Sequence, residues 1–127
     1  MKIPAIRPKR IAYFTPNKDK VIIITGALSG IGKSLAEELA SRGANVVLAA
    51  RQYVTLCEIT AALEVKYDIK ALAVQCDVSK EEDCISLIKQ TITTFGKIDG
   101  LINNAGLSMR ALFNDVELSV LKNLMDV

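Results

Sequence analysis

The segment that most constrains this chain is Val21 to Gly32, VIIITGALSGIG. A four-residue apolar run is followed by a threonine and then by three glycines, at positions 26, 30 and 32. A β-branched run of this length, bounded by glycine, is typical of a parallel strand that is buried on both faces. Apolar residues then recur at helical spacing: Ile31, Leu35 and Leu39, with Ala36 and Ala40 beside them. The segment therefore predicts a strand that leads into a helix through a glycine turn.

A strand, a glycine turn and a helix in this order can hold an anion. The first N–H groups of a helix have no partner inside it, and the helix dipole is positive at that end. Gly26, Gly30 and Gly32 would let a pyrophosphate approach the backbone without meeting a Cβ atom. Glycines also make ordinary turns between strands and helices, so these residues alone leave both interpretations open.

Two phosphate-binding loops resemble this segment in part. Gly32, Lys33 and Ser34 end like a P-loop, and Asp77 could then hold the magnesium ion of a nucleoside triphosphate. The P-loop pattern requires glycine where this chain has Ala27, so the count fails by one residue. The G-x-G-x-x-G pattern of many dinucleotide sites is also absent, because the chain reads T-G-x-x-x-G-x-G instead.

The T-G-x-x-x-G-x-G stretch that begins at Thr25, together with the downstream stretch Asn103-Asn104-Ala105-Gly106, resembles the two signatures of the classical short-chain dehydrogenase/reductase family. The resemblance runs from about Lys20 to the last residue and covers the amino-terminal portion of the family. It implies an α/β fold, a Rossmann-like doubly wound parallel sheet in the order 3-2-1-4. The sheet would be truncated after strand 4 and part of the following helix.

The resemblance implies a dinucleotide site at the carboxyl edge of the sheet, where the glycine turn and the NNAG stretch would face each other. Asp77 would bond the exocyclic amine of the adenine, or turn the chain into the next helix, or do both. Asn104 would bridge strands, and Asp99 would support the sheet. Leu28 departs from the family, which usually has a small polar residue there. The residues expected at the cofactor are Thr25, Gly26, Leu28, Ser29, Gly30, Ile31, Gly32, Arg51, Cys76, Asp77, Val78, Asn104, Ala105 and Gly106.

The end of the second predicted strand, NVVLAA over 45–50, indicates which cofactor is bound. In an NAD site an acidic residue at this point accepts hydrogen bonds from the adenosine ribose, and its charge repels a 2′-phosphate. This chain has Ala49, Ala50 and then Arg51, whose guanidinium suits a phosphate. The sequence therefore predicts NADP(H), although Arg51 could also be a solvated residue at the start of the next helix.

The remaining elements follow from apolar patterns and turn residues. Strands are predicted over 70–75 and 98–102, and helices over 54–67 and from a Ser79/Glu82 capping box to a stop at Gly96. Gly43 is expected to end the first helix. The predicted core-facing stripes of these two later helices are Val54, Leu56, Ile59 and Leu63, and Ile85, Ile88, Ile92 and Phe95. A last helix should open at Asn114, with the chain ending inside it.

Composition limits the class of protein further. A chain of 127 residues that is half hydrophobic can fold as one domain. No apolar run approaches the roughly 20 residues that span a membrane, so a soluble protein is expected. There is no histidine, and Cys57, Cys76 and Cys84 lack C-x-x-C spacing, so neither a metal site nor a histidine triad is expected. Scattered thiols that serve as small core residues fit a reducing, cytoplasmic setting.

The basic character of the chain is concentrated in its first residues. Residues 1–20 contain six basic residues and one acidic residue, a net charge of +5, whereas the whole chain has +2. Such an arm could contact nucleic acid or an anionic membrane, or direct the chain to an organelle, but Pro4, Pro8 and Pro16 would interrupt a targeting helix. Residues 1–19 are therefore expected to be a poorly ordered extension that binds neither nucleic acid nor a membrane. Residues 20–127 are expected to form the NADP-binding domain.

The catalytic residues that the resemblance implies are not found. The family reduces a carbonyl with a tyrosine that donates a proton, a lysine four residues later, a serine and an asparagine. The tyrosines here are Tyr13, Tyr53 and Tyr67, and their i+4 neighbours are Asn17, Cys57 and Ala71. No catalytic residue is therefore expected in this chain.

The resemblance implies an NADP(H)-dependent oxidoreductase that acts on a small carbonyl or alcohol, present here as its cofactor-binding half and inactive alone. Family members are usually homo-oligomeric. Two other functions stay open. One is a non-catalytic NADP-binding or interaction module, and the other is a P-loop nucleotide hydrolase, against which Ala27 and the NNAG stretch argue.

Overall fold

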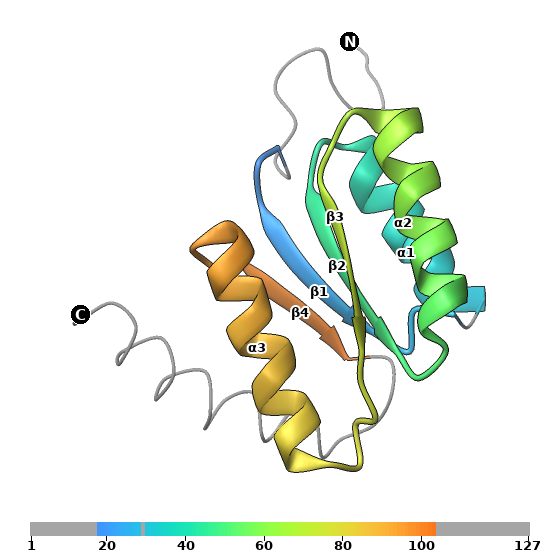
Figure 1. Ribbon diagram of the computed structural model, residues 1–127. Coiled ribbons are helices and arrows are strands. Elements are labelled where there is room, and N and C mark those ends of the chain that lie inside the picture. The colour runs from blue at the N-terminus through green and yellow to red at the C-terminus, as the bar shows by residue number, and fades with distance from the viewer. Residues whose placement is uncertain (1–17, 29, 104–127) are drawn as a thin grey trace, which may run out of the picture.

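The computed structural model describes residues 18–28 and 30–103, in which four strands alternate with three helices (Figure 1). The strands are β1 (Val21–Thr25), β2 (Asn45–Ala50), β3 (Ala71–Gln75) and β4 (Gly100–Asn103). The helices are α1 (Gly30–Ser41), α2 (Tyr53–Tyr67) and α3 (Glu81–Phe95). The expectations for the basic extension, for Ser29, for Asn104, Ala105 and Gly106, and for the last helix lie outside the described residues.

The four strands form one parallel sheet in the order β3-β2-β1-β4, which confirms the predicted topology. In Figure 1, α1 and α2 cover one face of the sheet and α3 covers the other. Two cores match these two layers. Ile24, Leu48 and Leu56 belong to the core under α1 and α2, and Ile23 and Leu87 belong to the core under α3. The sheet is thus doubly wound, and the carboxyl ends of its strands meet at one edge.

The predicted strands agree closely with the structure. The second strand has the predicted bounds, and the first contains the predicted apolar run and also Thr25. Both strands are almost wholly buried, as continuous apolar runs require. The third strand begins at Ala71 instead of Lys70, because Lys70 N donates to the side-chain oxygen of Asn45 at 2.9 Å. The fourth strand is displaced by one or two residues, from the predicted 98–102 to Gly100–Asn103.

The predicted core face of α1 is wrong at its first member. Ile31 is 69% exposed, whereas Gly32, Ala36 and Ala40 are buried. Small residues let a helix lie close to a sheet, and these three form the fully buried stripe, while Leu35 and Leu39 beside them are half-buried. The error has a parallel in α2, where Val54 is 73% exposed and Leu56, Thr60 and Leu63 are the buried residues.

The predicted start of α3 is also wrong. The helix begins at Glu81 after Lys80, which makes no side-chain capping bond, so Ser79 and Glu82 do not form a capping box. The Ser79 hydroxyl instead donates to Asp77 Oδ1 at 2.6 Å. Three acidic residues in the first turn, Glu81, Glu82 and Asp83, favour the helix electrostatically. The buried residues of α3 are Cys84, Leu87, Ile88, Thr91 and Ile92, so Ile85 and Phe95 are only half-buried members of the predicted stripe.

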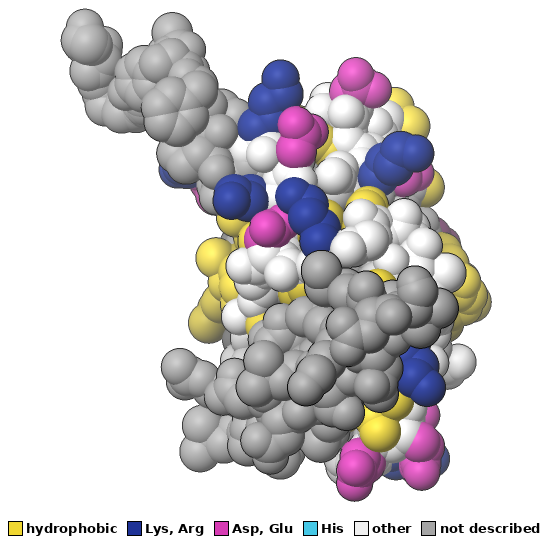
Figure 2. Space-filling view, turned by 90° about the vertical axis from the view of Figure 1, so that its left-hand side faces the viewer, with side chains coloured by type: hydrophobic (Ala, Val, Ile, Leu, Met, Phe, Trp, Pro, Cys, Tyr) yellow, Lys and Arg dark blue, Asp and Glu magenta, His cyan; other side chains and the backbone are white. Residues whose placement is uncertain are grey.

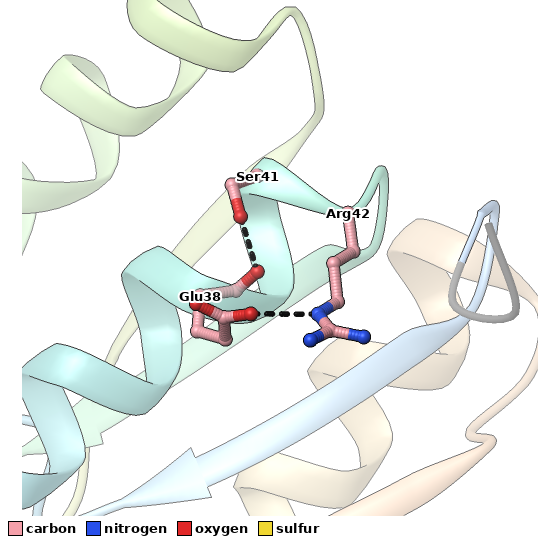
Figure 3. A network of polar contacts seen from close by, with 3 residues as sticks. All are labelled: Glu38, Ser41 and Arg42. Atoms are coloured by element: carbon pink, nitrogen blue, oxygen red, sulfur yellow. Dashed lines mark hydrogen bonds and ion pairs between the residues drawn. The ribbon is translucent and has the colours of Figure 1, made fainter. Parts of the chain in front are cut away.

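Gly43 and Gly96 end their helices as predicted. Gly43 has φ +91°, and its N–H donates to the carbonyl of Ala40 while Ala44 N–H donates to that of Leu39. This pair of bonds is a Schellman motif, which needs a left-handed residue. The last turn of α1 is also tied by Arg42 and Ser41, which hydrogen-bond the Glu38 carboxylate and carbonyl respectively (Figure 3).

Asp99 supports the sheet, as the family resemblance implied. Its Oδ2 accepts a hydrogen bond from Val21 N at 2.7 Å and pairs with Lys97 Nζ at 3.1 Å, and Asp99 N donates to the Val21 carbonyl at 2.8 Å. Burial alone would raise the pKa of Asp99, but the Val21 N–H and the Lys97 ammonium outweigh it and hold that pKa below its ordinary value. The ionised carboxylate therefore joins the entrance of β4 to β1.

A pH dependence follows from this lowered pKa. The unfolded chain binds more protons at Asp99 in acid, so the stabilisation by Asp99 is present above about pH 4 and is lost as pH falls through the native pKa. We expect Asp99→Asn to cost about 1 kcal/mol at pH 7 and nothing near pH 2. Thermal unfolding of both proteins between these pH values measures the difference, and a difference that does not change with pH would contradict the assignment.

Candidate cofactor site

A cavity of about 630 Å³ opens at the carboxyl edge of the sheet, over the ends of β1, β2 and β3. Its volume lies within the range that holds small-molecule ligands and cofactors. Six of the predicted cofactor residues line it: Gly26, Leu28, Arg51, Cys76, Asp77 and Val78. Three residues that were not predicted complete its wall: Ala49, Ala50 and Gln52. Residues from three separate parts of the chain are thus brought to one site.

A turn that begins at Gly26 leads from β1 into α1, as the glycine pattern predicted. Gly26 has φ +64°, a left-handed conformation that favours glycine. Ala27 is fully buried, and its N–H continues the pairing with β2 by donating to the Ala49 carbonyl at 3.4 Å. Helix α1 begins at Gly30, and a Cβ atom added there would meet no described heavy atom within 4 Å. Gly32 is buried against the sheet, and Ile31 is exposed beside these residues.

A side-chain hydrogen bond joins the ends of β1 and β4. Thr25 is fully buried, and its hydroxyl donates to Asn103 Oδ1 at 3.0 Å. The two residues are also direct partners in the parallel register. The bond holds together the two strands between which the order of the sheet reverses. Asn103 was not among the predicted site residues, because bridging was assigned to Asn104, which lies outside the described residues.

The end of β2 carries a cation and no carboxylate. Arg51 follows the last residue of the strand, is exposed, and has no ion-pair partner in the part of the chain that the structure describes. The Arg51 carbonyl accepts a hydrogen bond from Gln75 Nε2 at 3.1 Å, and Cys76 N donates to the Ala50 carbonyl at 2.9 Å. An exposed guanidinium at this edge can pair with a phosphate.

Asp77 shapes the loop after β3. Ser79 donates two hydrogen bonds to Asp77 Oδ1, from its hydroxyl at 2.6 Å and from its N–H at 3.0 Å. Asp83, in the first turn of α3, accepts a hydrogen bond from Asp77 N at 2.9 Å. The Ser79 bonds hold the pKa of Asp77 below its ordinary value, and the charge of Arg51 lowers it further. Asp77 therefore turns the chain into α3, which was one of its two expected roles.

The cysteines near the cavity are core residues. Cys76 and Cys84 are buried as predicted, whereas Cys57 is only half-buried, so the expectation of three core thiols is wrong for Cys57. Burial raises the pKa of Cys76 to about 12, and the neighbouring Cys84 and Asp83 add to the shift. Burial also raises the pKa of Cys84. Both buried thiols are therefore protonated near pH 7 and are poor nucleophiles.

Lys33 does not lie where a P-loop lysine would act. It lines a separate depression of about 230 Å³ along α1 and α2, whose other lining residues include Glu37 and Glu58.

Among residues 18–28 and 30–103, no three His, Cys, Asp or Glu side chains are close enough together to hold a metal ion. In the same ranges, none of the helices has both the length and the apolarity that crossing a membrane requires.

A doubly wound parallel sheet with a glycine turn and a cavity at its carboxyl edge defines a Rossmann-like α/β fold. The family model described as short chain dehydrogenase matches residues 20–127. The chain therefore belongs to the short-chain dehydrogenase family, as the two signatures indicated.

Proteins with similar sequences agree with this assignment to the short-chain dehydrogenase family. The chain is 43% identical over 109 residues to 11-beta-hydroxysteroid dehydrogenase A of Sesamum indicum, covering 85% of this chain and 31% of that protein. It is 44% identical over 124 residues to the uncharacterized oxidoreductase YxnA of Bacillus subtilis (strain 168), covering 97% of this chain and 34% of that protein. The chain thus spans about a third of the length of these relatives.

Solved structures show the same fold. L-sorbose reductase from Gluconobacter frateurii, complexed with NADPH and L-sorbose, has a TM-score of 0.69 and 39% identity, covering 73% of this chain and 35% of that chain. NAD+-bound xylitol dehydrogenase has a TM-score of 0.67 and 34% identity, covering 72% of this chain and 35% of that chain. Similar structures therefore include proteins with each nicotinamide cofactor, and a nicotinamide cofactor is supported for the family.

Proposed function

We propose that this chain is the NADP(H)-binding part of an oxidoreductase that interconverts a small carbonyl compound and an alcohol. The observation that carries the proposal is the cavity at the carboxyl edge, which contains Arg51 at the end of β2 and has no carboxylate at that strand end. Arg51 would pair with the 2′-phosphate of the cofactor. The NADPH complex of the similar L-sorbose reductase is consistent with this choice.

The other predicted cofactor residues, of which Gly26, Leu28, Cys76, Asp77 and Val78 line the cavity, have distinct roles in the proposal. Gly26, Gly30 and the first N–H groups of α1 would bind the pyrophosphate, with Thr25, Ser29, Ile31 and Gly32 forming the turn around it. Cys76, Asp77 and Val78 would line the adenine, with Leu28 opposite. Asn104, Ala105 and Gly106 would lie along the cofactor after β4. The bound nicotinamide would supply or accept the hydride.

The chain alone should bind the cofactor without reducing a carbonyl. None of the three tyrosines in the sequence has a lysine four residues later, so the sequence lacks the tyrosine and lysine pair with which the family donates a proton. The proposed partners are therefore the nicotinamide cofactor and, in a complete enzyme, a small carbonyl or alcohol substrate. On the face drawn in Figure 2, Lys and Arg side chains of described residues lie among Asp and Glu side chains, which does not favour a nucleic-acid partner. A cytoplasmic location and homo-oligomers complete the proposal.

A thermal-shift titration tests the proposal against its alternatives. A ligand that binds only the native state raises the unfolding temperature with its concentration. We expect NADPH to stabilise the chain at lower concentration than NADH does, and Mg-ATP to leave its stability unchanged. Stabilisation by Mg-ATP that disappears in Lys33→Ala would instead favour a nucleotide hydrolase, and stabilisation by none of the three ligands would overturn the proposal. Absorbance at the reduced nicotinamide band, with a panel of carbonyl compounds, would show whether the bound NADPH is consumed.

A further inference from the structure

The segment that carries Arg51 has few contacts of its own. Only Arg51 and Gln52 connect β2 to α2. Gln52 is the N-cap residue of α2, yet its side chain makes no capping hydrogen bond. The residue before this link is held by the sheet, because Ala50 accepts the hydrogen bond of Cys76 N. On the other side, the Gln52 carbonyl accepts a hydrogen bond from Leu56 N at 3.2 Å, so α2 holds that end of the link. The Arg51 carbonyl between these two anchors is left for a neighbouring strand to hold.

Gln75 supplies that contact. It is the last residue of β3 and the register partner of Ala50, so its backbone lies beside the end of β2. Its neighbours Val74 and Cys76 are buried on the α3 side of the sheet, and side chains alternate along a strand, so Gln75 projects toward the side of α2. From there its Nε2 donates to the Arg51 carbonyl at 3.1 Å.

We infer that Gln75 is a positioning residue that sets the preference for the 2′-phosphorylated cofactor through Arg51. The inference rests on the proposed function, since Arg51 is the residue assigned to the 2′-phosphate. The sheet holds the Ala50 carbonyl before Arg51, and the Gln75 amide holds the Arg51 carbonyl after its Cα atom, so both sides of that Cα atom are anchored and the direction of its Cα–Cβ bond is fixed. An arginine side chain loses considerable rotamer freedom when it binds, and a fixed starting direction reduces that loss.

A positioning role for Gln75 affects the affinity for NADPH but not the affinity for NADH, whereas a purely structural role would affect both affinities. NADH lacks the phosphate that Arg51 would contact, so the orientation of Arg51 matters little to it. Loss of the Gln75 hydrogen bond should therefore weaken NADPH binding and leave NADH binding unchanged. A neutral hydrogen bond of this kind corresponds to about a twofold to tenfold change in affinity.

The test compares Gln75→Met, which keeps the length of the side chain and removes its donor, with the native chain. Dissociation constants for NADPH and NADH come from the fluorescence of the reduced nicotinamide. Gln90→Met is a matched control, because Gln90 Nε2 makes a similar exposed hydrogen bond to Ser86 Oγ at 3.0 Å on α3. We expect Gln75→Met to weaken NADPH binding by about twofold to tenfold with NADH unchanged, and Gln90→Met to change neither.

A double-mutant cycle shows whether the effect passes through Arg51. In an Arg51→Ala background, Gln75→Met should have no further effect on NADPH. An equal loss for both cofactors, or an undiminished loss in the Arg51→Ala background, would overturn the inference while the proposed function stands. A native chain that does not prefer NADPH would overturn the proposed function and this inference with it. Thermal unfolding of each variant shows that it is folded before its affinity is compared.

Discussion

Replacing Arg51 by alanine should weaken NADPH binding by about 10- to 150-fold and leave NADH binding little changed. A charge-assisted hydrogen bond to the phosphate contributes about 1.5 to 3 kcal/mol, and losing one such bond gives this range of affinity. A bidentate pair of bonds at about 1.5 kcal/mol each would give its upper end. Arg51 is exposed at the cavity and has no ion-pair partner among the described residues. Its charge lowers the pKa of Asp77, but exposed charges contribute little to stability, so its loss should destabilise the fold only slightly. The two dissociation constants, measured side by side, check the prediction.

The chain offers a matched control for this variant in Arg42. Arg42 is also exposed, but it pairs with Glu38 at 2.7 Å at the far end of α1 from the cavity (Figure 3). Arg42→Ala removes the same charge and should alter neither affinity, with at most a small loss of stability, because exposed ion pairs contribute little. Equal losses for NADPH and NADH in Arg51→Ala would reject the assignment of Arg51 to the phosphate.

Gly30→Ala should abolish most cofactor binding while the native fold keeps its stability or gains a little. A Cβ atom at Gly30 would meet no described heavy atom within 4 Å, and Gly30 is the first residue of α1, where the preference of helix interiors for alanine over glycine applies only in part. The same atom would occupy the space in which a pyrophosphate approaches the first amides of α1. Losing two such charge-assisted hydrogen bonds corresponds to about a hundredfold or more in affinity for NADPH and NADH alike.

Gly43→Ala is the opposite case and serves as the control. Its φ of +91° strains any residue with a Cβ atom, and that atom would lie 3.3 Å from Lys18 Cα. This variant should unfold at lower temperature and bind the cofactor normally when folded. Gly30→Ala with native affinity would mean that Gly30 only shapes a turn, which is the alternative reading of the glycine pattern.

Apolar patterns predicted the strands well because a parallel sheet covered on both faces needs continuous apolar runs, and the family resemblance supplied the order of the strands. Val21–Thr25 and Asn45–Ala50 are such runs, and Ala71–Gln75 is a third. The helix faces were harder to predict. In α1 the sheet contacts Gly32, Ala36 and Ala40, and small residues give no signal in a search for large apolar ones.

The cavity residues could be predicted where a local motif carries them, and they were missed where two strands create the contact. Arg51 and Asp77 were found because each follows a recognisable strand. Asn103 and Gln75 were missed because their hydrogen bonds join residues 78 and 24 positions apart, and only the register of the sheet brings those residues together. The capping box at Ser79 failed because its hydroxyl bonds Asp77 instead.

The stripe of Gly32, Ala36 and Ala40 has a consequence for the phosphate end of the molecule. Gly32, which has no side chain, and the methyl groups of Ala36 and Ala40 set how near the axis of α1 lies to the strands. Because the helix is rigid, that spacing extends to its first turn. A larger side chain at Ala36, in the middle of this stripe, would tilt α1 or move it away from the sheet. The amides at its tip would then be displaced from their ligand by a substitution two helical turns away, with every residue around the cavity left intact.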